Sequence, residues 1–574
     1  MTKMTHLFAS ILLSTSLALA GQKVSKDLLR YGKSAQVDVI VRFIKEPTAA
    51  NLDELAKKGK EKKKFKKTKA VAITLSYKEI QALAADPNVA YVSLDRVVKP
   101  TLDVSASTIG ADLAVSYGYD GRGIGVAVID SGVKENADDL KFDGKSRVVY
   151  QESFLDTTRD PKDEYGHGTH VAGVVAGSGH RSTGNDFKAT LRGIAPRANI
   201  LNLRVLDKNG AGKDSDVIEA IERAIQLKAR YNIRVINLSL GRPVWESYKD
   251  DPLCHAVKAA WEAGLVVVVA AGNHGRNNNA GNDGYGTIGS PGNSPYVITV
   301  GAMNGKGTLT RSDDVIASYS SKGPTSIDHV VKPDLVAPGN RVGSIKADSY
   351  LWKTYEDNRV IDAEIKIKGG TGDSDYLRLN GTSVASPMVA GAVAVLLQKD
   401  PTLSPDQVKA RLMKTAYKAF PTSSLTTDLA TGRIYQSQYD IFTIGAGYLD
   451  LWAALRSTEV TATGKLSLSP IATYNHVTRT VTLSGSSAVW GDSAVWGDSG
   501  PFSMSAVWGD AVFLKGSSAV WGDSAVWGDS AVWGSKTTTG FSAVWGDSAV
   551  WGDSAVWGDT TTVEANSVLI KGEK

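Results

Sequence analysis

The sequence predicts an α/β fold for the central part of the chain, with a mostly parallel sheet between helices. The main indication is the run Gly123–Gly132, whose nearly unbroken apolar stretch is typical of a parallel strand buried on both faces. With 574 residues, of which 42% are apolar and 22% charged, the chain has the composition of a folded protein of about three or four domains. A lysine-rich region precedes this core and tryptophan repeats follow it, so we expect further domains on both sides.

Residues 1–20 have the pattern of a secretory signal peptide. Lys3 supplies a positive charge, Leu7–Leu19 is mainly apolar, and Ala18–Ala20 offers small residues for cleavage. A short buried helix is the alternative interpretation. We therefore expect the mature protein to be secreted, either extracellular or at the cell surface.

Composition also excludes several classes of protein. Cys254 is the single cysteine, so neither an intramolecular disulfide nor a metal cage of thiolates can form. No apolar run reaches the roughly 18 residues that a membrane span needs, which argues against an integral membrane protein.

Residues 21–100 are expected to form a small, basic α+β domain. Apolar and alternating segments predict strands over 37–43, 70–75 and 89–94, with helical stretches after 51 and 77. This region has 18 Lys and Arg against 9 Asp and Glu, whereas the net charge of the whole chain is only +5. Because the remainder is therefore acidic, we interpret the lysine run as a docking surface for it and consider nucleic acid an unlikely partner.

Two candidate catalytic residues precede the middle of the chain. Asp130 ends the first apolar run, and ligands of parallel sheets bind at such carboxyl ends, although a capping Asp would look the same. His167 opens a segment whose small residues at helical spacing predict a tightly packed helix. His170 follows three residues later, but the glutamate of the zinc protease pattern is absent, so we assign His170 to packing or hydrogen bonding.

The segment Gly381–Pro387 is the most specific motif. It reads Gly-Thr-Ser-Val-Ala-Ser-Pro and leads into an apolar helix. A serine at such a helix start, here Ser383, can present its hydroxyl beside free backbone N–H groups.

In this order, Asp, His and Ser, the three motifs resemble those of the subtilisin-like serine proteases. Further segments similar to that family are Asn202–Leu206, Val235–Gly241, Val266–Asn273 and Lys332–Gly339. The resemblance covers about residues 101–455 and implies a three-layer subtilisin-like fold and a secreted serine endopeptidase. Residues 21–100 resemble the family's inhibitory propeptide, which implies a zymogen that processes itself and is inhibited by its own propeptide.

The resemblance also implies a role for each site residue. Ser383 would be the nucleophile, His167 its general base, and Asp130 the group that orients the imidazole, while Asn273 would donate to the oxyanion. A protein or peptide substrate would bind as an added strand. The substrate-binding residues implied in this way are Gly210, Gly212, Ser239, Leu240, Gly241, Ala270 and Gly272.

No cofactor is implied for catalysis, and structural calcium, which many family members bind, stays open without assignable ligands. Met388 stands where the family usually has histidine, and we expect it to serve packing alone. Residues 242–252, 274–289 and 342–375 have the composition of polar insertions near the cleft.

The predicted domains are thus 1–20, 21–100, 101–456 and a repeat tail, 457–574. In the tail, Ala-Val-Trp-Gly occurs nine times, mostly within a Ser-Ala-Val-Trp-Gly-Asp hexamer. The even repeat length would place each tryptophan of the hexamers on the same face of an extended chain. A β-solenoid, an aromatic binding strip and a flexible spacer are equally compatible with this pattern.

Two other functions remain alternatives. A binding or adhesion protein would use the tryptophan repeats and carry an inactive protease domain, but all three catalytic residues and Asn273 are present. An esterase would use the same acyl chemistry, but the paired strand segments favour an extended peptide.

Overall fold

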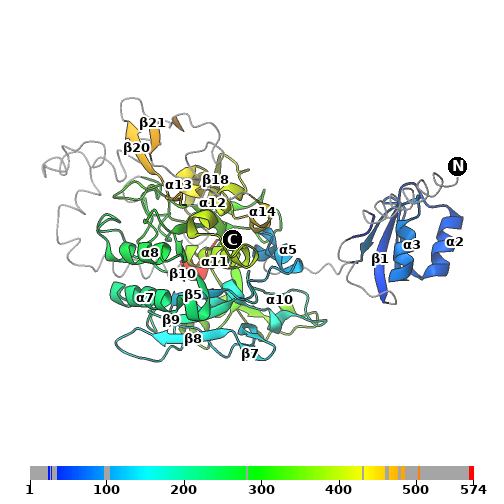
Figure 1. The fold of residues 1–574 in the computed structure, drawn as a ribbon, viewed down its shortest axis with the longest axis horizontal. Coiled ribbons are helices and arrows are strands. Elements are labelled where there is room, and N and C mark those ends of the chain that lie inside the picture. The colour runs from blue at the N-terminus through cyan, green and yellow to red at the C-terminus, as the bar shows by residue number, and fades with distance from the viewer. Residues whose placement is uncertain are drawn as a thin grey trace, which may run out of the picture. The chain divides into compact units, whose positions relative to one another are not determined.

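The computed structural model describes residues 23–25, 28, 35–95, 104–278, 282–428, 432–458, 464–475, 480–484, 502–503 and 568–573. They belong to two compact units, residues 1–99 and 100–574 (Figure 1). The predicted signal peptide and all nine tryptophan repeats lie outside the described residues.

The first unit is a four-stranded antiparallel sheet, in the order β2-β3-β1-β4, with two helices. Its elements are β1 (Gln36–Phe43), α2 (Ala49–Lys58), β2 (Lys60–Phe65), β3 (Ala70–Ser76), α3 (Tyr77–Ala84) and β4 (Val89–Leu94). Along β1, buried Val37, Val39 and Val41 alternate with more exposed residues, which is the expected pattern of a sheet with one packed face. Thr48 and Ser76 each start a helix with a capping box.

The lysine run contains a strand that has no apolar pattern in its sequence. β2 consists of Lys60–Phe65, lies at the edge of the sheet and exposes nearly every residue. Backbone pairing with the buried strand β3 explains its conformation, and charged side chains on an edge strand prevent further strands from adding there.

The second unit is built around an eight-stranded sheet in the order β13-β12-β11-β10-β5-β9-β8, with β14 also paired to β12. All pairs are parallel except β12 with β13, which confirms the predicted mostly parallel α/β fold. The strands are β5 (Gly125–Asp130), β8 (Val148–Ser153), β9 (Asn199–Arg204), β10 (Ile233–Leu238), β11 (Val266–Ala270), β12 (Ile298–Asn304), β13 (Val315–Ile316) and β14 (Leu335–Pro338).

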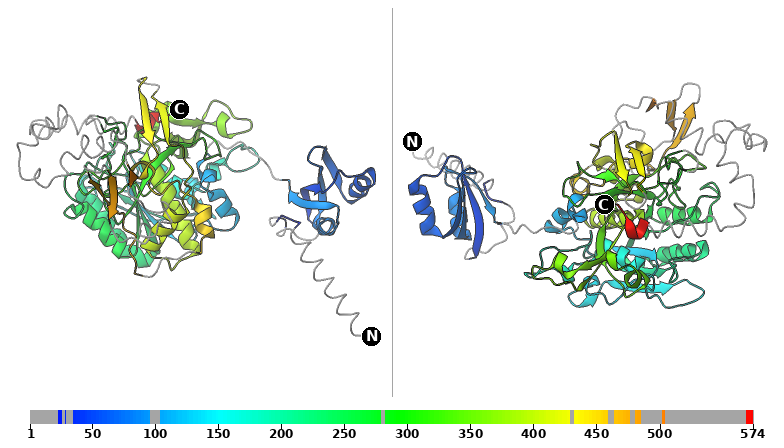
Figure 2. Two further views of the ribbon diagram at one scale, coloured as in Figure 1. Left: turned by 90° about the horizontal axis from the view of Figure 1, so that it is seen from above. Right: turned by 180° about the vertical axis from the view of Figure 1, so that it is seen from behind.

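Two pairs of helices pack against this sheet. Every residue of β5, β11 and β12 is buried, so both faces of the sheet must be covered. α6 (His167–Ala176) packs on α11 (Thr382–Lys399), and α7 (Asp214–Tyr231) packs on α8 (Pro252–Glu262), the pair seen side by side in Figure 1. Figure 2 shows the same layers from above and from behind.

Helix α11 has the length and hydropathy of a membrane span, but 89% of it is buried inside the second unit. It contacts β5, β10, β11, β12 and β14, which identifies it as the central core helix. Pro387 lies in the first turn and a half of α11, where few intrahelical hydrogen bonds are lost.

Part of the expected polar insertion at 342–375 is a small antiparallel sheet. β15 (Val342–Ile345), β16 (Arg359–Ile361) and β17 (Asp373–Leu379) pair in the order β15-β17-β16. The apolar side chains of Val342, Val360 and Leu379 are buried, but polar residues outnumber apolar ones in the segment, so its composition does not indicate strands.

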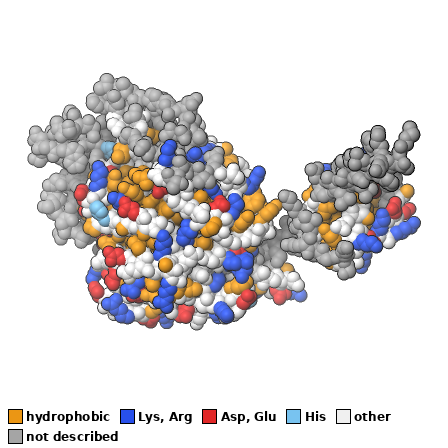
Figure 3. All heavy atoms as spheres, viewed as in Figure 1, with side chains coloured by type: hydrophobic (Ala, Val, Ile, Leu, Met, Phe, Trp, Pro, Cys, Tyr) orange, Lys and Arg blue, Asp and Glu red, His pale blue; other side chains and the backbone are white. Residues whose placement is uncertain are grey.

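The described residues after 456 also pack within the second unit. β20 (Ile471–Asn475), β21 (Thr480–Ser484) and β22 (Phe502–Ser503) form an antiparallel sheet. Ala472 and Val481 share an apolar cluster with Tyr285, Val331 and Phe442. On the face shown in Figure 3, acidic and basic side chains of the second unit are interspersed rather than gathered by sign.

Candidate active site

The three predicted catalytic residues lie at the ends of elements that pack together. Asp130 is the last residue of β5, His167 is the first residue of α6, and Ser383 is the second residue of α11. Helix α6 contacts both β5 and α11. The carboxyl end of a central parallel strand and the amino ends of two helices therefore meet, which is where sites of such sheets form.

Asp130 holds the imidazole of His167 through both carboxylate oxygens. The distances from His167 Nδ1 are 2.8 Å to Oδ1 and 3.0 Å to Oδ2, and both side chains are buried. The backbone N–H of Ser131 donates to Asp130 Oδ1 at 2.7 Å, which fixes the carboxylate in turn. An ionised carboxylate can only accept, so the proton of the neutral imidazole is held on Nδ1 and Nε2 is left as the base.

The electrostatics of this pair favour a protonated imidazole. Burial alone would lower the pKa of His167, but the charge and hydrogen bond of Asp130, with a smaller contribution from Asp163, raise that pKa above its ordinary value of 6.5. His167 is therefore a stronger base than a free imidazole, as a group that must remove a proton from a serine requires.

Asp163 orders the amino end of α6 and was not found from the sequence. Its Oδ1 accepts from Gly166 N at 2.6 Å and Ser131 Oγ at 2.9 Å, and its Oδ2 accepts from Thr169 N at 2.9 Å and Thr169 Oγ1 at 2.6 Å. Burial raises its pKa to about 6, although these hydrogen bonds act to lower that pKa. Asp163 lies three residues before the N-cap residue Gly166, so the N-cap preference does not identify it.

Gly168 allows α6 to approach the end of β5. A Cβ there would lie 2.2 Å from the carbonyl oxygen of Gly132 and 3.1 Å from Cβ of Asp130. No larger residue fits without moving the backbone, so this glycine sets the distance between the His167 and Asp130 segments.

Gly381 lies between Ser383 and Asn273, the predicted nucleophile and the predicted oxyanion donor. Its φ of 129° is unfavourable for other residues, and a Cβ there would lie 3.0 Å from Ser383 Oγ and 3.1 Å from Asn273 Nδ2. The serine hydroxyl and the asparagine amide thus face the same small space. Among the hydrogen bonds of the described residues, none joins Ser383 to His167, and such contacts often form only when substrate is bound.

Thr382 holds Asn273 in this orientation. The backbone N–H and Oγ1 of Thr382 donate to Asn273 Oδ1 at 2.9 and 3.1 Å, and Gly272 N donates to Thr382 Oγ1 at 3.1 Å. A backbone N–H can only donate, so it must face the amide oxygen, and the amide NH₂ is turned towards Gly381. Thr382 belongs to the Gly381–Pro387 motif, but the motif alone does not indicate this role.

His170 is a structural residue, as predicted. Its Nε2 contacts the carbonyl oxygens of Val342 and Leu377 at 3.0 and 3.1 Å, which joins α6 to β15 and β17. Burial, with the neighbouring His167 charge, lowers its pKa to about 3, so it stays neutral.

The residues implied for substrate binding lie in three loops that follow strands. Gly210 and Gly212 lie in the turn after β9, which is closed by the hydrogen bond from Asp207 N to Ala211 O at 2.8 Å. Gly241 is exposed and Leu240 half-buried after β10. Ser239 is buried instead, because its Oγ contacts Ser386 Oγ of α11 at 2.9 Å, so its side chain faces the core.

Ala270 is the last residue of β11, and Gly272 lies in the following segment that also carries Asn273. Ala270 closes β11 with 8% exposure, and Gly272 adopts a φ of 107°. A Cβ on Gly272 would meet Ser321 Oγ at 2.8 Å, so a side chain here would disturb the segment that positions Asn273.

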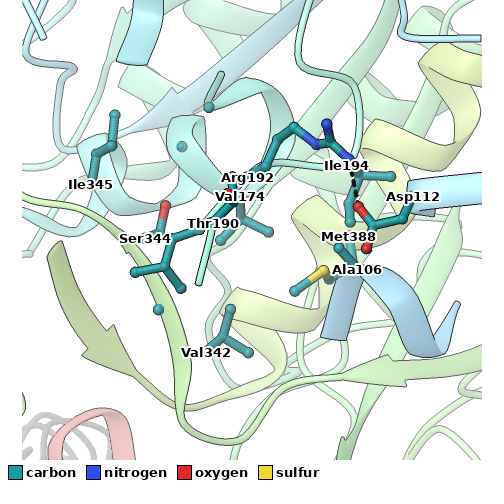
Figure 4. Close-up of a pocket in the computed structure, with 14 residues that line it drawn as sticks. Ala106, Asp112, Val174, Thr190, Arg192, Ile194, Val342, Ser344, Ile345 and Met388 are labelled. Carbon is teal, nitrogen blue, oxygen red and sulfur yellow. Dashed lines mark hydrogen bonds and ion pairs between the residues drawn. The ribbon is translucent and has the colours of Figure 1, made fainter. Parts of the chain in front are cut away.

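Two cavities among the described residues are lined by none of the residues implied for substrate binding. One, shown in Figure 4, lies beside α6 and α11 between Val174, Ser344 and Met388, with the Arg192–Asp112 ion pair on its wall. Its volume of about 30 Å³ suits water rather than a side chain of a substrate. Met388 is 3% exposed and packs there, in line with the packing role expected for it. The other cavity is lined by Arg122, Gly123, Phe142, Lys145, Ser146, Arg147, Arg197 and Asn199.

No group of three or more His, Cys, Asp or Glu side chains within the described ranges is arranged to hold a metal ion. Cys254 is buried and burial raises the pKa of its thiol, so it stays protonated beside Asn293 Oδ1 at 3.2 Å.

Comparisons with known proteins agree with this arrangement. The Subtilase family profile matches residues 121–443, which include Asp130, His167 and Ser383. The chain is 37% identical to "Serine protease AprX" of Bacillus subtilis over 366 residues, covering 62% of this chain and 75% of that protein. It is 35% identical to "Subtilisin E" of the same species over 373 residues, covering 64% and 81%.

Among solved structures, one described as a "cold adapted subtilisin-like serine proteinase" is 29% identical and covers 52% of this chain and 83% of that one, with a TM-score of 0.36. The family match spans more than half of the chain, and the fold and the predicted enzyme class agree with it. The chain is a serine endopeptidase of subtilisin-like fold and belongs to the subtilase family.

Proposed function

We propose that this endopeptidase cleaves peptide bonds with Asp130, His167 and Ser383, and that it is made as a secreted zymogen. The observation that carries the proposal is the paired arrangement of the site. Asp130 holds Nδ1 of His167, while Ser383 Oγ and Asn273 Nδ2 face one space at Gly381.

In the first step, Ser383 Oγ attacks the carbonyl carbon of the scissile bond. His167 Nε2 takes the hydroxyl proton, and the carbonyl π electrons move to the oxygen. The imidazolium that forms lies beside the Asp130 carboxylate, which stabilises its charge without taking the proton.

The oxyanion of this tetrahedral intermediate needs donors fixed before the reaction. Asn273 Nδ2 and the backbone N–H of Ser383 would supply them, since Thr382 restrains the asparagine and Ser383 lies in the first turn of α11. The positive end of the α11 dipole adds to the same stabilisation.

Collapse of the intermediate breaks the C–N bond, and the imidazolium gives its proton to the leaving amine. Water then attacks the acyl-enzyme, with His167 as base again, and releases the carboxylic acid and free Ser383. The side chains supply every proton transfer, so catalysis needs no cofactor. A structural calcium ion stays a prediction.

We further propose that the substrate binds as an extended strand between the Gly210–Gly212 turn and the Ser239–Gly241 segment. Backbone groups of exposed, glycine-containing segments can pair closely with a peptide. Ala270 and Gly272 would line the first side-chain pocket, where their small size leaves room for a large residue.

The zymogen proposal is supported by the division of the chain into two units near residue 99. A folded unit of its own, with a charged edge strand, fits a propeptide that folds before the catalytic unit and is removed. Secretion is supported by the pattern of residues 1–20.

The test is a time course of the intact mass of the full chain beside Ser383→Ala. We expect the wild type to be cut between about residues 94 and 107 and the variant to stay whole. Cutting of both chains at the same rate would show that another protease does the processing. Stability of both would refute self-processing.

A further inference from the structure

Residues 568–573 return to the second unit after 64 residues, 504–567, that lie outside the described part of the chain. Val568 and Leu569 are 8% and 6% exposed and join the large core that contains α6 and α11. The side chain of Glu573 is 1% exposed. We call these six residues the strap.

The strap binds the loop that leads into the nucleophile. The backbone N–H and the Nδ2 of Asn380 both donate to the carbonyl oxygen of Leu569 at 3.0 Å. Asn380 lies three residues before Ser383, and its Oδ1 accepts from Arg341 N at 2.7 Å. Asn358 Nδ2 also donates to the carbonyl oxygen of Ile570 at 2.8 Å.

Glu573 binds a second loop, the one that carries the oxyanion asparagine. Its Oε1 accepts from Ser318 N at 2.7 Å, from Ser318 Oγ, and from Arg276 at 3.2 Å. Arg276 lies three residues after Asn273, and its Nε also donates to Ser318 Oγ at 2.8 Å.

Asn340 fixes the strap between these two loops. Its Nδ2 donates to the carbonyl oxygen of Glu573 at 2.6 Å, and its Oδ1 accepts from Glu573 N at 2.8 Å. This pair of bonds imitates the pairing of a β-strand, so the strap is held by its backbone as well as by the buried carboxylate.

From these contacts we infer that the strap positions the oxyanion hole, with Glu573 as a positioning residue. The oxyanion donors come from two loops, and Thr382 links them directly beside Ser383 and Asn273. The strap joins the same two loops at a second place, because it contacts Asn380 before Ser383 and Arg276 after Asn273. The strap therefore adds to the direct contacts of Thr382 in keeping Asn273 Nδ2 aligned with the Ser383 N–H.

The inference rests on the proposed function, and it concerns the kcat of peptide cleavage. Loss of one oxyanion donor lowers kcat by about 10²–10³, a magnitude established for a subtilisin. A residue that acts through the donor should lower it less, and Glu573→Ala should reduce kcat about tenfold with KM changed less than twofold.

The experiment compares Glu573→Ala and the shape-conserving Glu573→Gln in the full chain with Lys571→Ala, a control at an exposed strap residue. Each is also combined with Asn273→Ala. If Glu573 acts through the asparagine, its substitution should change kcat less than twofold in the Asn273→Ala background. Lys571→Ala should leave kcat unchanged.

Three results would overturn the inference. The first is an unchanged kcat in both Glu573 variants. The second is an increased kcat, which would mean that the strap obstructs the site. The third is the same tenfold loss of kcat with and without Asn273. The last would indicate a general loss of structure. An inactive wild type would instead refute the proposed function, so the two failures are distinguishable.

Discussion

Replacing Asp130 with asparagine tests how the buried carboxylate acts on His167. In the structure, Asp130 Oδ1 already accepts the Ser131 N–H at 2.7 Å, so the amide oxygen of the new side chain must occupy that position. Its NH₂ then lies where Oδ2 was, 3.0 Å from His167 Nδ1. The Nδ1–H can keep its 2.8 Å contact with the amide oxygen only with the new NH₂ against it, and a shift of the proton to Nε2, where the ring can no longer accept from Ser383, relieves that repulsion.

The variant also loses the charge that stabilises the imidazolium. Opposite unit charges about 3–4 Å apart at an effective dielectric constant of about 20 attract each other by about 4–6 kcal/mol. Each 1.36 kcal/mol is a tenfold rate change, so Asp130→Asn should lower kcat/KM by about 10³–10⁴. The thermal midpoint should change little, since the side chain keeps its shape.

The pH profile gives a second, independent readout. The neutral imidazole is the base, so kcat/KM of the wild type should rise with pH through the raised pKa of His167, above 6.5. Without the carboxylate, burial alone acts on His167 and lowers its pKa, so the acid limb should move to lower pH. A chromogenic peptide assay between about pH 5 and 9 measures both effects. A fall of less than tenfold with an unmoved acid limb would refute this account of Asp130.

Three shorter predictions follow from the packing. Asn273→Ala should lower kcat by about 10²–10³ and leave KM nearly unchanged. A rise in KM of that size with kcat unchanged would assign the residue to substrate binding instead. Gly168→Ala should lower both the melting temperature and kcat, because its Cβ would meet the carbonyl oxygen of Gly132 at 2.2 Å; normal values in both assays would contradict the close approach of α6. Asp334→Ala should lower the free energy of unfolding by about 3–5 kcal/mol, because it leaves buried Lys332 and Lys409 without their carboxylate. The control Asp138→Ala, which removes one partner of an exposed ion pair, should lower it by at most about 1 kcal/mol. Urea unfolding measures both, and equal losses would refute this reasoning.

The sheet and its central helix were predictable because their sequences are unambiguous. Five residues in a row at Val266–Ala270 are apolar, and α11 is apolar on all sides, which only a fully buried element tolerates. The edge strand Lys60–Phe65 carries no such signal, because its position is set by pairing with β3 rather than by burial. Propensity and periodicity cannot detect an element of that kind.

The site was predictable to the extent that it lies in short motifs. Asp130, His167 and Ser383 stand in contiguous segments, and each lies at the end of the element expected for it. The residues that hold them were missed because their partners are distant in sequence. Asp163 acts through hydrogen bonds to Ser131 and Thr169, and Glu573 reaches Ser318 across 255 residues.

The orientation of the Ser239 side chain could not be predicted from its motif. Ser239 directly follows the central strand β10, and its side chain turns to Ser386 of α11. Which face a residue presents at a strand end depends on the local backbone, which a one-dimensional motif does not specify.

The central claim is that Ser383 is the nucleophile of an Asp130–His167 pair. The most direct measurement is peptide mapping of the full chain after reaction with a serine-directed fluorophosphonate, beside Asp130→Asn and Ser383→Ala. The account predicts a single phosphonylated residue, Ser383, formed far more slowly in Asp130→Asn and absent from Ser383→Ala. Modification of another serine, or no modification of a chain that cleaves peptides, would contradict it.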